Sequence, residues 1–408
     1  MPAIPARVIF TLRAFRHRNY RLFFMGQGIS LIGTWMQSVT LGYLTYRLTN
    51  SAFLLGMVGF ASQIPTVLFT PLGGVAADRK DRRTLLLITQ SLAMVQASLL
   101  AALTLTGTIE VWHIITLSVF LGCINAFDIP TRQSFIVEMV ESRADLSNAI
   151  ALNSTMFNGA RLIGPSVGGL LIATTGEGIC FLINAISFSA ALAALALMRI
   201  TPVEQPAEHP PVFRQLKEGF SYAFGLRPIK YILLLLGLTS FVGMPYAVLM
   251  PVFAKDILHG DARTLGFLMS AAGVGAIFGA IRLASRKNTA GLGRDIARAS
   301  LLFGLCLTAF SFSRSLPFSL ALMAVAGGSV MTQMASGNTI LQTIVDDKRR
   351  GSVMSLYALS FGGMMPLGSL VAGSLAHAIG VPHTLFIAGV VCIAGALAFR
   401  SRLKKIIL

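Results

Sequence analysis

The chain has 408 residues, of which 54% are hydrophobic and only 12% are charged. Ordinary globular domains carry about 25% charged residues, and a soluble protein of this size could not bury so much apolar surface. The composition therefore excludes a soluble protein and indicates an integral membrane protein. The apolar runs are continuous and lack the period-2 alternation of a transmembrane barrel, so we expect the spans to be helices.

Twelve apolar runs are close to or longer than the about 20 residues that a helix needs to cross the hydrocarbon core. They lie at residues 22–47, 53–77, 84–106, 112–130, 149–173, 178–198, 230–254, 264–285, 296–313, 316–337, 351–377 and 383–400. With the amino terminus inside, nearly all of the 33 Lys and Arg residues share one face, and only Arg47, Lys255, Arg263 and Arg314 reach the other. This bias predicts that both termini are cytoplasmic. The net charge of +17 therefore reports topology, and we expect no nucleic-acid partner.

The first span carries a stripe of polar residues at helical spacing, namely Gln27, Ser30, Thr34 and Gln37. Such residues inside a membrane helix either line a cavity or make hydrogen bonds to neighbouring helices. We favour a cavity for this stripe and leave the alternative open.

Six charges crowd into the segment Gly73–Arg83, between the second and third predicted spans. It resembles the loop between these spans in the major facilitator superfamily, where a Gly is followed four residues later by Asp, then Arg, and then by Gly and two basic residues. The matching residues are Gly74, Asp78, Arg79, Arg82 and Arg83, and Asp81 stands where the family prefers Gly. The resemblance implies a cytoplasmic gate, with Asp78 docking on the eleventh-span helix, which would begin near Gly351 and Ser352. The alternative is that the basic residues only set the topology.

No Asp or Glu lies deep in any predicted span, which limits the candidates for a proton carrier. A proton-driven exporter needs a carboxyl group whose pKa is raised by burial. Asp128, at the end of the fourth span, is the first candidate, and Glu138, in the following loop, is the second. Asp128 could pair with Arg132 four residues later or with Arg161, and the sequence does not decide between them.

Arg161 lies near the centre of the fifth span, where a charge costs roughly 2.5–3.5 kcal/mol even on the mild insertion scale. It shares one helical face with Ser154 and Asn158. We expect Arg161 to bind an anionic group of a substrate or to belong to a coupling pair. A structural salt bridge is the alternative.

The run from Gly164 to Gly169 resembles the Gly-Pro-x-x-Gly-Gly core of a signature found in drug and proton antiporters of the same superfamily. Pro165 removes a backbone donor and is expected to bend the helix. Gly164, Gly168 and Gly169 allow another helix to approach closely. The motif either belongs to antiport or serves packing alone, and both interpretations stay open.

A proline-rich stretch interrupts the hydropathy in the middle of the chain. We predict an amino-terminal six-helix bundle at 1–198, a cytoplasmic linker with a short amphipathic helix at 199–229, and a carboxy-terminal six-helix bundle at 230–408. Faint internal similarity supports two halves, because Leu55-Gly56 and Leu265-Gly266 open the second and eighth spans alike.

The stretches Gly26–Gly56 and Leu146–Pro165, with the segment DIPTRQSF, resemble the enterobactin-exporter-like branch of the superfamily. The resemblance implies an all-α membrane fold of 12 transmembrane helices in two pseudo-symmetric six-helix bundles. It further implies a monomeric secondary-active transporter of the bacterial inner membrane, which exports a small amphipathic, siderophore- or drug-like molecule by proton antiport and alternating access. By this analogy the substrate-binding residues are Gln27, Ser30, Thr34, Gln37, Asn158, Arg161, Tyr246, Gln333 and Ser336, and the coupling residues are Asp128, Arg161 and Glu138.

Two other functions remain possible from the sequence: a lipid or lysolipid flippase, and a membrane receptor that transports nothing. An enzyme is not expected, because the chain shows no phosphate loop, no zinc-spaced His and Cys cluster and no nucleophile elbow in a suitable context. For the same reasons we expect neither a metal nor a cofactor.

Overall fold

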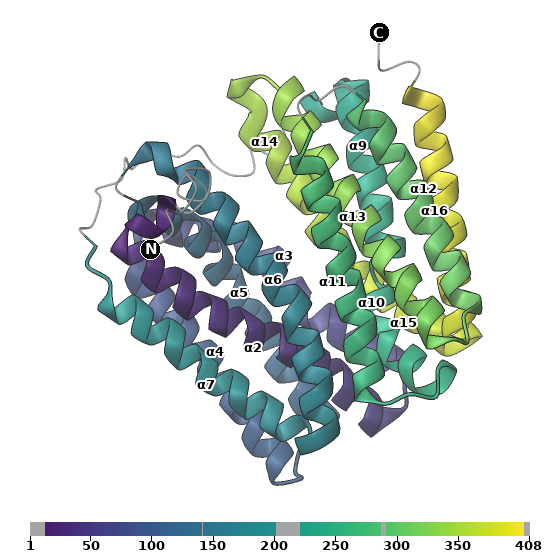
Figure 1. Cartoon of the computed structure of the whole chain (residues 1–408), viewed down its shortest axis with the longest axis horizontal. Coiled ribbons are helices and arrows are strands. Elements are labelled where there is room, and N and C mark those ends of the chain that lie inside the picture. Colours follow the sequence, from purple (N-terminus) through teal and green to yellow (C-terminus); the bar gives the residue numbers. More distant parts are fainter. Residues whose placement is uncertain (1–12, 141, 201–220, 287–290, 404–408) are drawn as a thin grey trace, which may run out of the picture. The chain divides into compact units, whose positions relative to one another are not determined.

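A computed structural model describes residues 13–140, 142–200, 221–286 and 291–403, and helices make up most of these ranges (Figure 1). Two compact units emerge from the packing. One comprises Met1–Leu41 and Leu68–Glu208, and the other comprises Gly42–Val67 and His209–Leu408. The predicted bundle limits 1–198 and 230–408 stay a prediction, because residues 201–220 of the predicted linker lie outside the described residues.

The first unit begins with a short 3₁₀ turn, η1, and contains most of six long helices. These elements are η1 (Arg13–Arg16), α2 (Arg18–Thr49), α3 (Ala52–Arg79), α4 (Arg82–Leu105), α5 (Val111–Met139), α6 (Arg143–Thr175) and α7 (Glu177–Leu197). The end of α2 and the start of α3 belong to the second unit.

In the second unit, three π-helical turns, η2 to η4, interrupt the helices that follow the linker. The elements are α9 (Arg227–Leu238), η2 (Thr239–Gly243), α10 (Tyr246–Val252), η3 (Phe253–Ile257), α11 (Ala262–Ala284), α12 (Leu292–Phe312), α13 (Leu316–Ile344), α14 (Asp347–Ala358), η4 (Leu359–Gly363), α15 (Met364–Ile379) and α16 (Val381–Leu403). Within this unit α13 packs against α11 and α12, and α12 packs against α16 (Figure 1).

Ten helical segments of the described residues are long and apolar enough to cross a membrane. Each overlaps one of the predicted spans, and the two remaining predicted spans, the first and the fifth, overlap the long helices α2 and α6. Polar residues lower the hydropathy of α2 and α6, among them Gln27 and Gln37 in α2 and Asn158 and Arg161 in α6. The all-α membrane fold is confirmed, and the total of twelve crossings stays a prediction.

Two helix ends differ from the sequence-based expectation. The fourth span was predicted to end at residue 130, but α5 continues to Met139, so Glu138 lies in a helix and not in a loop. Pro130 is tolerated inside α5, and the next hydroxyl, Thr131 Oγ1, donates to the carbonyl of Phe127 at 2.6 Å. Likewise α14 begins at Asp347, ahead of the predicted start near Gly351. The polar run Thr131–Ser134 interrupts the apolar sequence of α5, and the residues that α14 adds ahead of Gly351 are charged, so hydropathy placed both helix ends too early.

A buried polar chain connects four helices of the first unit. Gln37 of α2 donates to Gln96 of α4 at 3.0 Å and accepts from Asn184 of α7 at 2.7 Å. Gln96 in turn donates to the carbonyl of Leu117 in α5 at 3.2 Å. Because buried amides without partners cost free energy, these paired amides hold the helices in one register.

The segment Gly42–Val67 packs against residues from the second half of the chain, a grouping that the sequence did not predict. Gly56 lies so close to α15 that a Cβ there would be 2.8 Å from the Cα of Gly373. Tyr46 donates a hydrogen bond to Asp256, and Lys255 donates to Asn50 at 2.8 Å. Apolar and polar contacts therefore tie this helical hairpin into the second unit.

Candidate functional site

Trp35, Phe157 and Arg161 form an aromatic–cation cluster in the first unit. The guanidinium carbon of Arg161 lies 5.7 Å from the centroid of the Trp35 ring, and the rings of Trp35 and Phe157 meet edge to face with centroids 5.7 Å apart. Gly164 makes this arrangement possible, since a Cβ at that position would lie 2.5 Å from Trp35 Cβ. The absent side chain lets α6 approach α2 closely, so that Trp35 reaches Arg161 one turn before Gly164.

The rest of the Gly164–Gly169 motif also lies inside α6. Pro165 is accommodated within this helix, and a Cβ at Gly168 would lie 3.1 Å from Met36 Cγ. Gly164 and Gly168 therefore supply the surface on which α2 rests, while Gly169 is buried. This geometry describes a packing role and leaves the predicted role in antiport untested.

Arg161 lies within ion-pair distance of no acidic side chain in the part of the chain that the structure describes. Its contact with Trp35 is a cation–π interaction, which contributes about 0.5–2 kcal/mol. On the same helix, Asn158 donates to the carbonyl of Ser154 at 2.8 Å. Arg161 therefore has an aromatic neighbour and no acidic one within the described residues.

Asp128 pairs with Arg132, which was one of the two partners left open by the sequence. Their side chains approach to 3.0 Å, and only 4% of the Asp128 side chain is exposed. The other carboxylate oxygen accepts from Thr89 Oγ1 at 3.0 Å and from Gln90 Nε2 at 2.7 Å. Asp128 is thus a buried carboxylate with one cationic and two neutral donors, all within the first unit.

The predicted gate residues differ in their contacts and in their exposure to solvent. Arg82 binds Glu138 at 2.7 Å and lies 3.8 Å from Asp78, so it connects the ends of α3, α4 and α5. Arg83 donates to the carbonyls of Leu195 and Ala196 near the end of α7, at 2.8 and 2.7 Å. Arg79 is exposed at the end of α3. Arg82 and Arg83 therefore anchor this corner of the first unit, whereas Arg79 stays accessible.

Asp81, the residue that departs from the family pattern, caps α4. Its carboxylate accepts from the backbone N–H of Thr84 at 2.7 Å. Burial alone would raise the pKa of Asp81, but hydrogen bonds from Thr84 and from the backbone N–H of Arg83, together with the charge of Arg83, lower it overall. An N-cap accounts for an Asp at a position where Gly would serve only to make a turn.

We expect Asp81→Ala to destabilise the protein by about 1 kcal/mol and Asp81→Asn to change it little, because Asn caps helices as well as Asp. Thermal unfolding in detergent at pH 7 measures both. Since the pKa of Asp81 is lowered in the folded state, the contribution of its charge is complete at neutral pH and is lost as the pH falls below the ordinary value of 3.8. Equal stability of the Ala and Asn variants would contradict the cap.

Gly73 and Gly74 are neighbours with opposite surroundings. A Cβ on Gly73 would lie 2.8 Å from the carbonyl carbon of Ala126 and 3.0 Å from the Cα of Phe127, and closer still to the Ala126 oxygen. A Cβ on Gly74 would meet no atom within 4 Å. Sequence reasoning selected Gly74 from the family pattern and passed over Gly73, because only the fold brings α3 against the backbone of α5.

We predict that Gly73→Ala destabilises the protein by about 1–3 kcal/mol, because an α5 backbone atom must move to admit the methyl group. Gly74→Ala is the matched control and should be neutral or slightly stabilising, since Ala favours a helix over Gly. Thermal unfolding of both variants in the same detergent measures the difference in stability between them. Indistinguishable midpoints would rule out the close approach.

The second unit holds a buried polar cluster on α13 and η2. Gln333 Nε2 donates to Thr239 Oγ1 at 3.0 Å. Gln333 Oε1 and Ser336 Oγ are buried and accept or donate no hydrogen bond among the described residues. Tyr246, which opens α10, is buried and lies edge to face with Phe303, with ring centroids 6.1 Å apart. Unpaired buried polar atoms call for an explanation, and a bound polar molecule is one.

The π-helical turns beside this cluster could not be found from the sequence. η2 begins at Thr239, and the next residue, Ser240, donates to the carbonyl of Phe361 in η4. A π-helical turn leaves carbonyl groups outside the regular helical pattern, and such turns are frequent at functional sites. The hydrogen bond between η2 and η4 thus joins the two interrupted helices of this unit near Gln333.

The polar residues of the α2 stripe differ in their hydrogen-bond partners. Gln37 is engaged with Gln96 and Asn184, which is the interhelical alternative left open by the sequence. Thr34 donates to the carbonyl of Ser30 on its own helix at 2.9 Å. The Ser30 hydroxyl is buried without a partner among the described residues, and Gln27 is buried as well. No set of three His, Cys, Asp or Glu side chains in the described ranges could hold a metal.

Comparison with known proteins matches residues 9–406 to the model of a family described as transmembrane secretion effectors. A staphyloferrin A transporter of Staphylococcus aureus is 26% identical over 393 residues, which cover 95% of this chain and 97% of the relative. The multidrug efflux pump Tap of Mycolicibacterium fortuitum is 24% identical over 89% of this chain and 88% of the pump. The crystal structure of a mutant nucleoside transporter, NupG, covers 94% of this chain and 99% of its own with a TM-score of 0.76. Its 13% identity shows a shared fold alone.

Proposed function

Because the chain belongs to the transmembrane secretion effector family of the major facilitator superfamily, we propose that it exports a small amphipathic organic molecule by alternating access. The observation that carries the proposal is the match over residues 9–406, together with efflux relatives that align over nearly their whole length. The chain is a multi-pass membrane protein of bacterial type. Its placement in the inner membrane with both termini cytoplasmic is part of the proposal and rests on the distribution of Lys and Arg.

The aromatic–cation cluster and the buried polar cluster support the proposed substrate class. Arg161 offers a cation beside two aromatic rings, which suits a molecule with an anionic group and an apolar or aromatic body. Gln333 Oε1 and Ser336 Oγ offer neutral hydrogen bonds in the other unit. A siderophore- or drug-like molecule fits this chemistry better than a sugar or a bare inorganic ion.

We assign proton coupling to Asp128, with Glu138 as the second carboxyl. Protonation of Asp128 would remove the charge that holds Arg132, and the two neutral donors Thr89 and Gln90 could still bind the neutral acid. Binding and release of one proton would therefore switch one ion pair in the first unit. Glu138 is paired with Arg82 in the same way, at the corner where the predicted gate lies.

The gate proposal rests on Asp78 and Arg79. Arg82 and Arg83 hold the turn between α3 and α4 on the first unit, where Asp78 lies 3.8 Å from Arg82 and Arg79 is exposed. The amino terminus of α14 lies at Asp347, before the predicted start near Gly351. A helix amino terminus favours a nearby carboxylate.

A flux measurement with purified protein tests the function. Liposomes with an acidic interior are supplied outside with staphyloferrin A and with anionic and cationic fluorescent dyes, each in turn. Protein inserted with its cytoplasmic face outward should accumulate at least one probe, and collapse of the pH gradient by a protonophore should abolish the accumulation. Movement of fluorescent lipids between leaflets without probe uptake would instead favour a flippase, and probe binding without flux would favour a receptor.

A further inference from the structure

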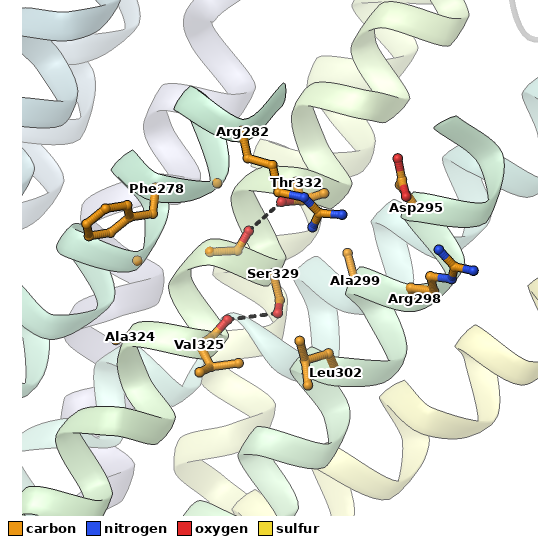
Figure 2. A pocket seen from close by; sticks show the side chains of 13 residues that line it. Phe278, Arg282, Asp295, Arg298, Ala299, Leu302, Ala324, Val325, Ser329 and Thr332 are labelled. Atoms are coloured by element: carbon orange, nitrogen blue, oxygen red, sulfur yellow. Dashed lines mark hydrogen bonds between the residues drawn. The ribbon is translucent and has the colours of Figure 1, made fainter. Parts of the chain in front are cut away.

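A groove of about 400 Å³ lies on the surface of the second unit, between α11 and α12 and above α13 (Figure 2). It is a separate feature from the residues proposed for substrate, and its lining comes from three helices of one unit. The wall residues include Phe278 and Arg282 of α11, Arg298 and Leu302 of α12, and Val325 of α13.

Small residues create the groove. A Cβ at Gly275 would lie 2.6 Å from the carbonyl carbon of Ala324, and one at Gly279 would lie 2.6 Å from the oxygen of Gly328. These glycines let α11 and α13 meet backbone to backbone, which keeps the α11 side of the floor low. On α12, the small side chain of Ala299 also lines the groove.

One end of the groove is cationic. Arg282 and Arg298 line it from opposite helices, both are exposed, and neither has an acidic partner among the described residues (Figure 2). Asp295, the acidic residue at this end, is paired with Arg286. The hydroxyls of Ser329 and Thr332 donate to carbonyls of their own helix, each at 2.8 Å. The two unpaired guanidinium groups therefore dominate the charge of this end.

The other end is apolar and open to the side. Phe278 is 67% exposed, Leu302 44% and Val325 42%, and all three lie on helices that are long and apolar enough to cross a membrane. In the orientation proposed above, the loop after α11 is cytoplasmic, so the arginines lie at headgroup level and the apolar residues at the level of acyl chains. Basic residues in the loop would be enough to set the membrane topology. Arg282 and Arg298 instead lie within α11 and α12 and line the groove.

We propose that this groove binds an anionic phospholipid of the cytoplasmic leaflet. Arg282 and Arg298 hold the phosphate, and the acyl chains lie along Phe278, Leu302 and Val325. Basic pockets between membrane helices on the cytoplasmic side bind anionic headgroups in this manner. The charge of the two arginines selects against zwitterionic lipids, and the apolar wall selects against a soluble anion.

Native mass spectrometry of the full chain in detergent tests the proposal, with phosphatidylglycerol and phosphatidylcholine of the same acyl chains as probes. The variant Arg282→Gln/Arg298→Gln should bind phosphatidylglycerol about 30-fold more weakly, because it removes two nearby charges that contribute about 1 kcal/mol each. The matched control, Arg294→Gln/Arg400→Gln, removes two exposed arginines outside the groove and should bind as the wild type does. Binding of phosphatidylcholine should be weak and equal in all three proteins.

Two further measurements separate the sources of the phosphate. Val325→Trp fills the apolar wall without changing a charge and should also weaken phosphatidylglycerol binding. The soluble headgroup glycerophosphoglycerol should not compete at concentrations equal to those of the lipid. Unchanged lipid binding in Arg282→Gln/Arg298→Gln, an equal loss in the control pair, or equally tight binding of the soluble headgroup would overturn the proposal. The measured quantity is lipid binding and not transport, so the test of the lipid proposal is independent of the proposed export.

Discussion

Replacing Arg132 by Ala is expected to destabilise the protein by about 3–5 kcal/mol, because the change leaves the carboxylate of Asp128 buried without its cation. Only 4% of the Asp128 side chain and 17% of the Arg132 side chain are exposed, and they approach to 3.0 Å. Thr89 and Gln90 each donate one hydrogen bond to the other oxygen, but neutral donors cannot replace a positive charge. Thermal or denaturant unfolding of the purified protein in detergent measures the loss.

The double variant Asp128→Asn/Arg132→Ala is the control for this prediction. A neutral amide can still accept from Thr89 and Gln90, and it no longer needs Arg132, so much of the stability should return. The free energies of the two single variants and the double variant then give the coupling between the residues. Additive effects would show that the pair contributes nothing beyond its separate contacts. If Asp128 carries the proton, the double variant should be stable and yet fail to use a pH gradient.

Arg161→Ala is expected to lower transport of an anionic probe by about 10–100-fold, since a hydrogen bond to a charged group contributes about 1.5–3 kcal/mol. Folding stability should change by only about 1 kcal/mol, the range of a cation–π contact such as the one with Trp35. Arg161→Lys keeps the charge and should retain part of the transport. Probe uptake into liposomes, normalised to the amount of inserted protein, provides the measurement.

Asn158→Ala supplies the comparison for Arg161. Asn158 lies one turn earlier on α6, and its amide is spent on the carbonyl of Ser154, so its removal should affect transport much less. A cationic probe gives a second check, because removing Arg161 should not reduce, and could increase, its transport. Wild-type rates for the anionic probe in Arg161→Ala would refute a role in substrate binding and leave Arg161 as a packing residue over Trp35.

Hydropathy located the helices but not their ends. The predicted fourth span stops at residue 130, before the polar run Thr131–Ser134, whereas the helix runs to Met139 and carries Glu138 into contact with Arg82. Helix ends at the membrane surface are polar, and their extent depends on contacts with neighbouring helices. An ion pair between α4 and α5 leaves no periodic signal in the sequence, so the helical position of Glu138 could not be predicted.

The candidate site was predictable residue by residue, but not as an arrangement. An arginine in the middle of a span is conspicuous because of its high transfer free energy, and Arg161 was found for that reason. Its neighbour Phe157 is an ordinary apolar residue in sequence, and only the close approach of α6 to α2 at Gly164 brings Phe157 and Trp35 together. In the same way, Gln37 matched a cavity stripe by spacing, although the fold turns it toward Gln96 and Asn184.

Composition and periodicity by themselves determined that this chain is an all-α membrane protein and where most of its helices lie, because hydrocarbon accepts long apolar segments only when their backbone bonds are satisfied internally. The charged segment Gly73–Arg83 by itself also indicated the superfamily. Only the tertiary structure decided that Asp128 pairs with Arg132, that Gly73 and not Gly74 meets α5, and that Arg282 and Arg298 border one groove. Those facts depend on which helix faces meet, and inside a membrane the apolar faces of different helices are nearly interchangeable until close packing selects one arrangement.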